Sequence, residues 1–249
     1  MNGFEALAQY YDRFVGADYD KIISFIDRKI KAYFPEASLV CDVGCGSGTV
    51  TFGLSEKGYD MIGIDGSMDM LTEAMNKRAD HTNGDGVLLL LQQLPEFELY
   101  GTVDAIISTL YTLNYISTEE DLDRLFYWFQ NYLNPEGLLI FDINSHYKYQ
   151  TLLNNHCEIY DNDEIFLSWR SGFDGQFCSH QLTFFEKNGS IYQRRDEEQL
   201  QRFFSSETIE RLMNQYGFEL LEISDDYSNQ TINAETQRIT YIARKRSNK

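Results

Sequence analysis

The chain of 249 residues, 43% of them apolar, has the size of one α/β domain with an embellishment. Its 39 acidic and 21 basic residues give a net charge of −18, which disfavours nucleic-acid partners because they require cationic contacts. Four cysteines without a C-x-x-C pair and four histidines do not favour a metal site, and no apolar run approaches the ~18 residues of a membrane helix. We therefore expect a single domain over residues 1–249, cytoplasmic and without membrane contact, as a monomer or homodimer.

Residues 2–33 carry apolar side chains at helical spacing. Phe4, Leu7 and Tyr11 fall at positions i, i+3 and i+7, and four isoleucines continue an apolar stripe further along. The segment 16–20 contains a glycine and two acids and separates these two stripes. The pattern predicts two helices with a break between them.

The segment 38–74 holds the strongest pattern in the chain. Residues 39–43 are apolar and predict a buried strand, and three glycines follow at positions 44, 46 and 48. Residues 49–57 predict a short helix, and residues 59–64 predict a second strand that ends in Asp65. This order of strand, glycine turn, helix, strand and acid is typical of the first half of a nucleotide-binding βαβ unit.

The glycine turn and the acid suit a ligand with a ribose. Gly44, Gly46 and Gly48 permit positive φ and close approach of the backbone, and the following helix points its N–H groups at the ligand. Asp65 lies 21 positions after Gly44 (65 − 44), where an acid accepts hydrogen bonds from ribose hydroxyls. The turn reads G-x-G-x-G, so the G-x-G-x-x-G of NAD-dependent oxidoreductases is missing.

These motifs resemble those of a known family. DVGCGSG at residues 42–48 and GIDGSMDML at residues 63–71 are similar to motifs I and II of class I S-adenosylmethionine (SAM)-dependent methyltransferases. The resemblance covers most of the chain and is closest to small bacterial members with an N-terminal "YD" segment and a β-rich insert after the fifth strand. It implies an α/β fold with a Rossmann-like sheet of seven strands, mostly parallel with the last antiparallel, plus a small antiparallel β insert.

The resemblance also implies SAM as cofactor and a set of cofactor-binding residues. Motif I supplies Asp42, Gly44, Cys45, Gly46 and Gly48, and motif II supplies Asp65, Gly66 and Met70. Tyr11 of the "YD" pair would face the cofactor, although a plain core position explains this tyrosine equally well. Ser67 predicts the N-cap of a helix over residues 68–78.

Residues 87–91 predict a third strand, after which the sequence departs from the family. The family has an aspartate here that accepts a hydrogen bond from the adenine amino group, and this chain has Gln92, Gln93 and Leu94. Gln93 occupies the position of the aspartate, and its amide oxygen is still an acceptor, without the strength of a charged one. Alternatively, a backbone group binds adenine and Gln93 is only a loop residue.

Residues 103–109 predict a fourth strand, which ends at Thr109. Ligands bind at the carboxyl ends of parallel strands, so the site should be faced by the strand end at Thr109 and by the following residues Tyr111, Thr112, Leu113, Asn114 and Tyr115. The family often has an aspartate where Tyr111 stands, so the acceptor pocket departs from the family pattern.

The next elements are a helix and a fifth strand. Ser117 and Glu120 form a capping-box pattern before an amphipathic helix that ends ahead of Pro135. Residues 138–143 predict the fifth strand, and His146 follows its end.

Residues 146–201 alternate aromatic and polar side chains and contain the hairpin signal Asn188-Gly189. We expect three or four antiparallel strands that cover the active-site cleft, with a self-packing flap or a dimer surface as alternatives. Ser205 and Ser206 then predict a helix start and Gly217 its end. Residues 218–224 and 237–244 predict the antiparallel pair that closes the sheet.

Methyl transfer from SAM depends mainly on positioning, because the sulfonium is already an activated leaving group. Tyr111, Tyr115 and His146 are the candidate catalytic residues, with Asn114 and Arg202 also on the acceptor side; a surface-loop position is the simpler interpretation of His146. Gln199 stands where the family often has a histidine, and an amide is no base near neutral pH.

The sequence thus predicts a SAM-dependent methyltransferase with a small-molecule acceptor. The substitutions at Gln93, Tyr111 and Gln199 leave a non-catalytic SAM-binding regulatory protein as an alternative, and an RNA-modifying methyltransferase is disfavoured by charge.

Overall fold

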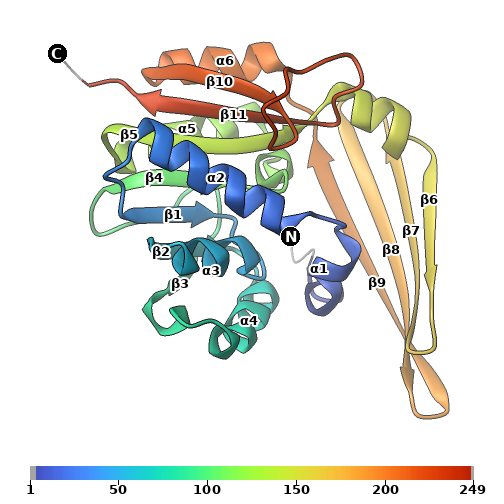
Figure 1. Ribbon diagram of the computed structural model, residues 1–249. Helices are drawn as coiled ribbons and strands as arrows, with labels where there is room; N and C mark the ends of the chain where they lie inside the picture. The colour runs from blue at the N-terminus through green and yellow to red at the C-terminus, as the bar shows by residue number, and fades with distance from the viewer. Residues whose placement is uncertain (1–3, 248–249) are drawn as a thin grey trace.

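The computed structural model describes residues 4–247. It contains a seven-stranded sheet and, beside it, a separate four-stranded sheet (Figure 1). The strands of the first sheet are β1 (Leu39–Val43), β2 (Asp60–Asp65), β3 (Leu88–Leu91), β4 (Val103–Ser108), β5 (Leu133–Asn144), β10 (Phe218–Asp225) and β11 (Arg238–Lys245). The strands of the second sheet are β6 (His156–Asp161), β7 (Ile165–Phe173), β8 (Phe177–Asn188) and β9 (Ile191–Arg202).

Residues 4–247 also contain six α-helices and several 3₁₀- or π-helical turns. The α-helices are α1 (Tyr11–Phe14), α2 (Tyr19–Tyr33), α3 (Thr49–Glu56), α4 (Met68–Lys77), α5 (Glu119–Tyr132) and α6 (Ser206–Gln215). The shorter turns are η1 (Ala8–Tyr10), η2 (Arg78–Asp80), η3 (Gly84–Gly86), η4 (Thr112–Tyr115) and η5 (Lys148–Leu153).

The strand order of the first sheet is β10-β11-β5-β4-β1-β2-β3. Strands β3, β2, β1, β4 and β5 run parallel, and β11 pairs antiparallel with both β5 and β10. The predicted fold, a mostly parallel Rossmann-like sheet of seven strands with an antiparallel last strand, is therefore confirmed. The order reverses beside β1, which is where open α/β sheets bind their ligands.

Helices cover both faces of the first sheet and bury two apolar cores. The apolar stripe of α5, with Leu122 and Phe126, packs with α6 against one face. On the other face the stripe of α2, with Phe25 and Ile26, packs with α3. Strands buried on both faces explain why the sequence shows continuous apolar runs instead of alternation.

The insert forms the four-stranded antiparallel sheet β6-β7-β8-β9, as the aromatic alternation predicted. Its tight hairpin places Asn188 opposite Ile191, with Gly189 at φ 63°. One face of this sheet, with Leu182 and Phe184, packs on Ala6 and Leu7 of the N-terminal segment. Ala6 and Leu7 consequently lie against β9, and α1 lies beside the second sheet (Figure 1).

Three local expectations need correction. The helix predicted for the first part of residues 2–33 is reduced to the short turns η1 and α1. It ends before the predicted break, where Gly16 has φ 62°. Residues 2 and 3 of the prediction lie outside the described residues. The N-cap of α5 is Thr118, whose side chain accepts from Asp121 N at 3.0 Å. The capping box at Ser117 was wrong because the Ser117 carbonyl is engaged by the Arg202 guanidinium at 2.9 Å.

Strand β5 also begins five residues before the predicted position, at Leu133. Pro135 is exposed there, beside a register shift between β4 and β5, and a proline is tolerated at such an irregularity because no ladder hydrogen bond needs its nitrogen. Within residues 4–247, no helix is both long and apolar enough to cross a bilayer.

Candidate active site

A cavity of about 670 Å³ opens at the carboxyl ends of β1, β2, β3 and β4, on the side of the four-stranded sheet. Its volume lies in the range of about 300–1,000 Å³ that is usual for small-molecule sites. It brings together many of the residues that the sequence singled out: Tyr11, Gly44, Gly46, Asp65, Gly66, Met70, Gln92, Gln93, Leu94 and Tyr115.

The glycine turn and Asp65 form one rigid unit. Gly44 and Gly46 have φ 79° and 54°, and the Gly44 amide donates to the Ile64 carbonyl at 2.8 Å. The Asp65 carboxylate accepts from Gly46 N at 2.9 Å and from Ser67 N at 2.8 Å. Burial raises the pKa of Asp65, against the effect of these amides. Each carboxylate oxygen keeps a lone pair for a further donor, such as a ribose hydroxyl.

The two glutamines after β3 have different tasks. Gln92 accepts from Glu98 N at 2.6 Å and donates to Glu98 O at 3.0 Å, so its side chain holds the loop together. Gln93 donates to the Gly66 carbonyl at 3.3 Å, which leaves its amide oxygen as the end that can accept. Gln93 thus has the polarity that an adenine amino group requires.

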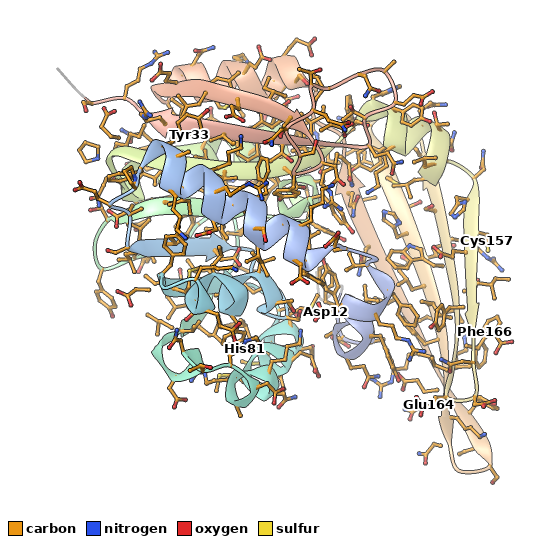
Figure 2. All side chains as sticks on the ribbon, viewed as in Figure 1. Asp12, Tyr33, His81, Cys157, Glu164 and Phe166 are labelled. Atoms are coloured by element: carbon orange, nitrogen blue, oxygen red, sulfur yellow. The ribbon has the colours of Figure 1, made fainter. Side chains whose placement is uncertain are left out.

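Asp12 fastens the N-terminal segment to the glycine turn, a role that the sequence did not reveal. It lies beside the helices that follow the turn (Figure 2) and accepts from Ser47 Oγ and Thr49 Oγ1, both at 2.8 Å. Lys77 of α4 forms a salt bridge with the same carboxylate. Burial raises the pKa of Asp12, but the hydrogen bonds, first of all that from Lys77, lower it below its usual value. This cluster fixes the neighbouring Tyr11 at the cavity.

A chain of hydrogen bonds connects the other side of the cavity to the N-terminal segment. Tyr115 donates to Gln199 Oε1 at 3.0 Å, and Gln199 donates to Glu197 Oε1 at 2.7 Å. Glu197 Oε2 accepts from Ala6 N at 2.9 Å and Leu7 N at 3.0 Å. Burial raises the pKa of Tyr115, so its hydroxyl keeps its proton and cannot act as a base at neutral pH.

Other predicted residues do not line this cavity. They are Asp42, Cys45, Gly48, Thr109, Tyr111 and His146. Asp42 is fully buried and accepts from Thr51 Oγ1 at 2.6 Å, and burial raises its pKa to about 7. Gly48 is required for packing, because a Cβ there would lie 2.8 Å from the Phe52 ring.

The predicted catalytic residues Tyr111 and His146 lie elsewhere for separate reasons. The Tyr111 ring is covered by Lys148 Nζ at 4.7 Å and the Arg238 guanidinium at 5.5 Å from its centroid. His146 borders a separate surface pocket and packs against the Phe203 ring at 5.3 Å.

Asn114 and Arg202, also expected on the acceptor side, hold the fold together. The Asn114 amide donates to Arg202 O at 2.8 Å and accepts from Asn144 N at 2.9 Å. The Arg202 guanidinium donates to Ser117 O.

Thr112, expected at the end of the fourth strand, does line the cavity, and a Cβ at Gly44 would lie 2.2 Å from its side chain; Leu113, also expected there, is buried in the core. Several other lining residues were not named from the sequence, either because they flank the named residues or, like Phe4 and Glu5, because they come from a distant segment. They are Phe4, Glu5, Ser67, Met68, Asp69, Leu91, Leu110, Ile116, Ser117, Glu198 and Leu200. Among the described residues no three acidic, histidine or cysteine side chains gather into a metal site.

A parallel sheet with its cavity beyond β1 and β2, a glycine turn and a carboxylate facing that cavity defines a class I methyltransferase architecture. A family of proteins described as "Methyltransferase domain" matches residues 11–223, and the chain belongs to this family. It is a SAM-dependent methyltransferase.

Individual relatives agree. The putative methyltransferase YqeM of Bacillus subtilis is 30% identical over 246 residues, 97% of each chain. A SAM-dependent methyltransferase structure from Clostridium acetobutylicum has a TM-score of 0.88 at 32% identity, covering 98% of this chain and 99% of that one. A dTDP-3-amino-3,4,6-trideoxy-α-D-glucopyranose N,N-dimethyltransferase of Streptomyces venezuelae is 31% identical over 136 residues, 53% of this chain and 55% of that protein.

Proposed function

We propose that the chain transfers the methyl group of SAM to a small-molecule acceptor bound in the 670 Å³ cavity. The observation that carries this proposal is that one continuous cavity is lined by Asp65 and the glycine turn at one side and by Tyr115 and Gln199 at the other. A donor and an acceptor can therefore share it. The insert, residues 146–201, would cover this cleft within a single domain.

The residues present fit SAM. The backbone at Gly44 and Gly46 would lie against the methionine part, Asp65 would accept from the ribose hydroxyls, and Gln93 would accept from the adenine amino group. Bound SAM supplies a methyl group on a positively charged sulfur, which departs as a neutral thioether. The protein itself has to position the acceptor and exclude water, and such positioning accounts for a large share of the rate in reactions of this kind.

Three observations support a small acceptor. The cavity has the size of small-molecule sites, and its lining includes residues of the N-terminal segment and of β9. The net charge of −18 disfavours RNA. The Streptomyces venezuelae relative is named for a small-molecule substrate, a dTDP-linked amino sugar.

Transfer of an isotopically labelled methyl group tests the proposal. The protein is incubated with methyl-labelled SAM and a bacterial extract that has been separated into RNA, protein and low-molecular-mass fractions. We expect label in the low-molecular-mass fraction with the wild-type protein and not with Asp65→Ala. Label that enters RNA or protein would contradict a small acceptor.

A further inference from the structure

We propose that the molecule that receives the methyl group is a primary or secondary amine without phosphate or carboxylate groups. The Tyr115 hydroxyl oxygen orients this amine by accepting a hydrogen bond from its N–H group. This inference rests on the proposed function, because it assumes that the acceptor occupies the cavity. It is carried by the direction of the hydrogen bonds behind Tyr115, by the charge of the cavity and by its aromatic side chains.

The Glu197 carboxylate determines which group donates and which accepts in each of these hydrogen bonds. Its carboxylate accepts from two backbone amides and can only accept, so the amide that meets it at 2.7 Å must be the NH₂ end of Gln199. The oxygen of Gln199 then faces Tyr115, whose hydroxyl has to donate to it at 3.0 Å. Having used its single proton, the Tyr115 hydroxyl can only accept from its other partners, and the Gln201 side chain is already one of them. One lone pair of the hydroxyl oxygen is left for a further donor. A substrate that hydrogen-bonds to the Tyr115 oxygen must therefore donate an N–H or O–H group.

The charge of the cavity selects among such groups. The described lining residues include four acids, Glu5, Asp65, Asp69 and Glu198, and no lysine, arginine or histidine. A phosphate or carboxylate on the methyl acceptor would find no cationic side chain among these lining residues to pair with. An ammonium group is attracted by the same field, so amines are favoured over neutral hydroxyl compounds.

Aromatic rings favour the same class. Phe4, Tyr11 and Tyr115 line the cavity, with ring centroids 5.3 Å apart for Phe4 and Tyr115 and 6.1 Å apart for Phe4 and Tyr11. Organic cations bind to the faces of such rings, and methylation of an amine produces a cation. Both the protonated acceptor and its methylated product therefore suit this wall.

The chemistry balances without a further reactant. An ammonium first loses one proton to water, and the lone pair of the free nitrogen then forms the new N–C bond as the methyl–sulfur bond breaks. The electrons of the broken bond stay on sulfur, which becomes the neutral thioether of S-adenosylhomocysteine. The positive charge passes to the methylated nitrogen, which releases a proton to water after leaving the cavity.

Three probes that share one ring test the inference: cyclohexylamine, cyclohexanol and cyclohexanecarboxylate. Their affinities for the complex with S-adenosylhomocysteine are measured by calorimetry or ligand-observed NMR. We expect cyclohexylamine to bind about tenfold more tightly than cyclohexanol, and the carboxylate not to bind. Tyr115→Phe should weaken cyclohexylamine binding roughly fivefold, while Tyr100→Phe, at a fully exposed tyrosine, should leave it unchanged.

Equal or tighter binding of cyclohexanol or the carboxylate would overturn the inference, as would failure of cyclohexylamine to bind or an unchanged affinity in Tyr115→Phe. S-adenosylhomocysteine binding is measured first in each sample. If the wild-type protein does not bind S-adenosylhomocysteine, the cofactor site itself is refuted. If it binds S-adenosylhomocysteine but shows no preference for the amine, only the proposed class of methyl acceptor is refuted.

Discussion

Asp65 Oδ2 accepts the backbone N–H of Gly46 at 2.9 Å, so the acid that ends β2 is fixed directly to the glycine turn after β1. The second oxygen accepts from Ser67 N, at the N-cap of α4, at 2.8 Å. The carboxylate is thereby oriented before any ligand arrives. A group held this way loses little entropy on binding, which is the reason for pre-organised sites.

Asp12 is expected to matter for cofactor binding although it does not line the cavity. Asp12→Asn removes the charge that pairs with Lys77 and leaves one oxygen for the hydroxyls of Ser47 and Thr49. We expect a loss of about 1–3 kcal/mol in unfolding free energy and a severalfold weaker affinity for S-adenosylhomocysteine. Denaturant unfolding and calorimetry measure both. The control is Asp20→Asn at an exposed site of α2, and equal behaviour of the two variants would contradict the role of Asp12.

Glu197 should hold the N-terminal segment over the cavity. In Glu197→Gln one of the two oxygens becomes an amide, so the variant cannot accept from Ala6, Leu7 and Gln199 together. We expect faster hydrogen exchange at the Ala6 and Leu7 amides by roughly 10- to 100-fold, since a hydrogen bond to a charged group contributes about 1.5–3 kcal/mol. Hydrogen–deuterium exchange measured by mass spectrometry on the peptide that contains Ala6 and Leu7 tests this prediction. Unaltered protection, as expected for the exposed control Glu158→Gln, would show that the segment is held by its apolar contacts alone.

Asp42 should make stability depend on pH. Its carboxyl has an ordinary pKa of 3.8, and burial raises it to about 7 in the folded protein. Between these values the folded chain binds more protons than the unfolded chain, so this group's contribution to stability is present at low pH and is lost as pH rises through 7. Asp42→Asn should remove up to about 4 kcal/mol of this dependence. Urea unfolding at several pH values tests it, and identical pH slopes in both proteins would contradict the buried titration.

The sequence predicted the central sheet because its signals are local. The glycine turn, the spacing of Asp65 and the apolar runs each lie within a short segment, and the Asn188-Gly189 hairpin is equally local. The cap of α5 was displaced by one residue because the carbonyl of Ser117 is bound by Arg202, 85 positions away in the sequence. Such a contact leaves no trace in the local pattern.

The cofactor side of the cavity was predictable for the same reason, and the acceptor side only in part, through Tyr115 after the fourth strand. Asp65 and Gln93 sit at strand ends that the sequence locates, and both line the cavity. Gln199 reaches it only because the insert folds back against the N-terminal segment, where Glu197 accepts from Ala6 N. His146 follows a strand end too, but the chain turns there and the side chain packs in a different surface pocket.

The most direct test of the central claim is the affinity for S-adenosylhomocysteine measured by titration calorimetry in wild type, Asp65→Asn and Asp60→Asn. Asp60 is the exposed residue at the opposite end of β2 and serves as the matched control. We expect tight binding by wild type and Asp60→Asn. Binding by Asp65→Asn should be roughly 10- to 100-fold weaker, because an amide replaces the carboxylate that would accept charged hydrogen bonds from the ribose. Absence of binding in the wild type, or equal affinity in all three proteins, would contradict the assignment of this cavity to SAM.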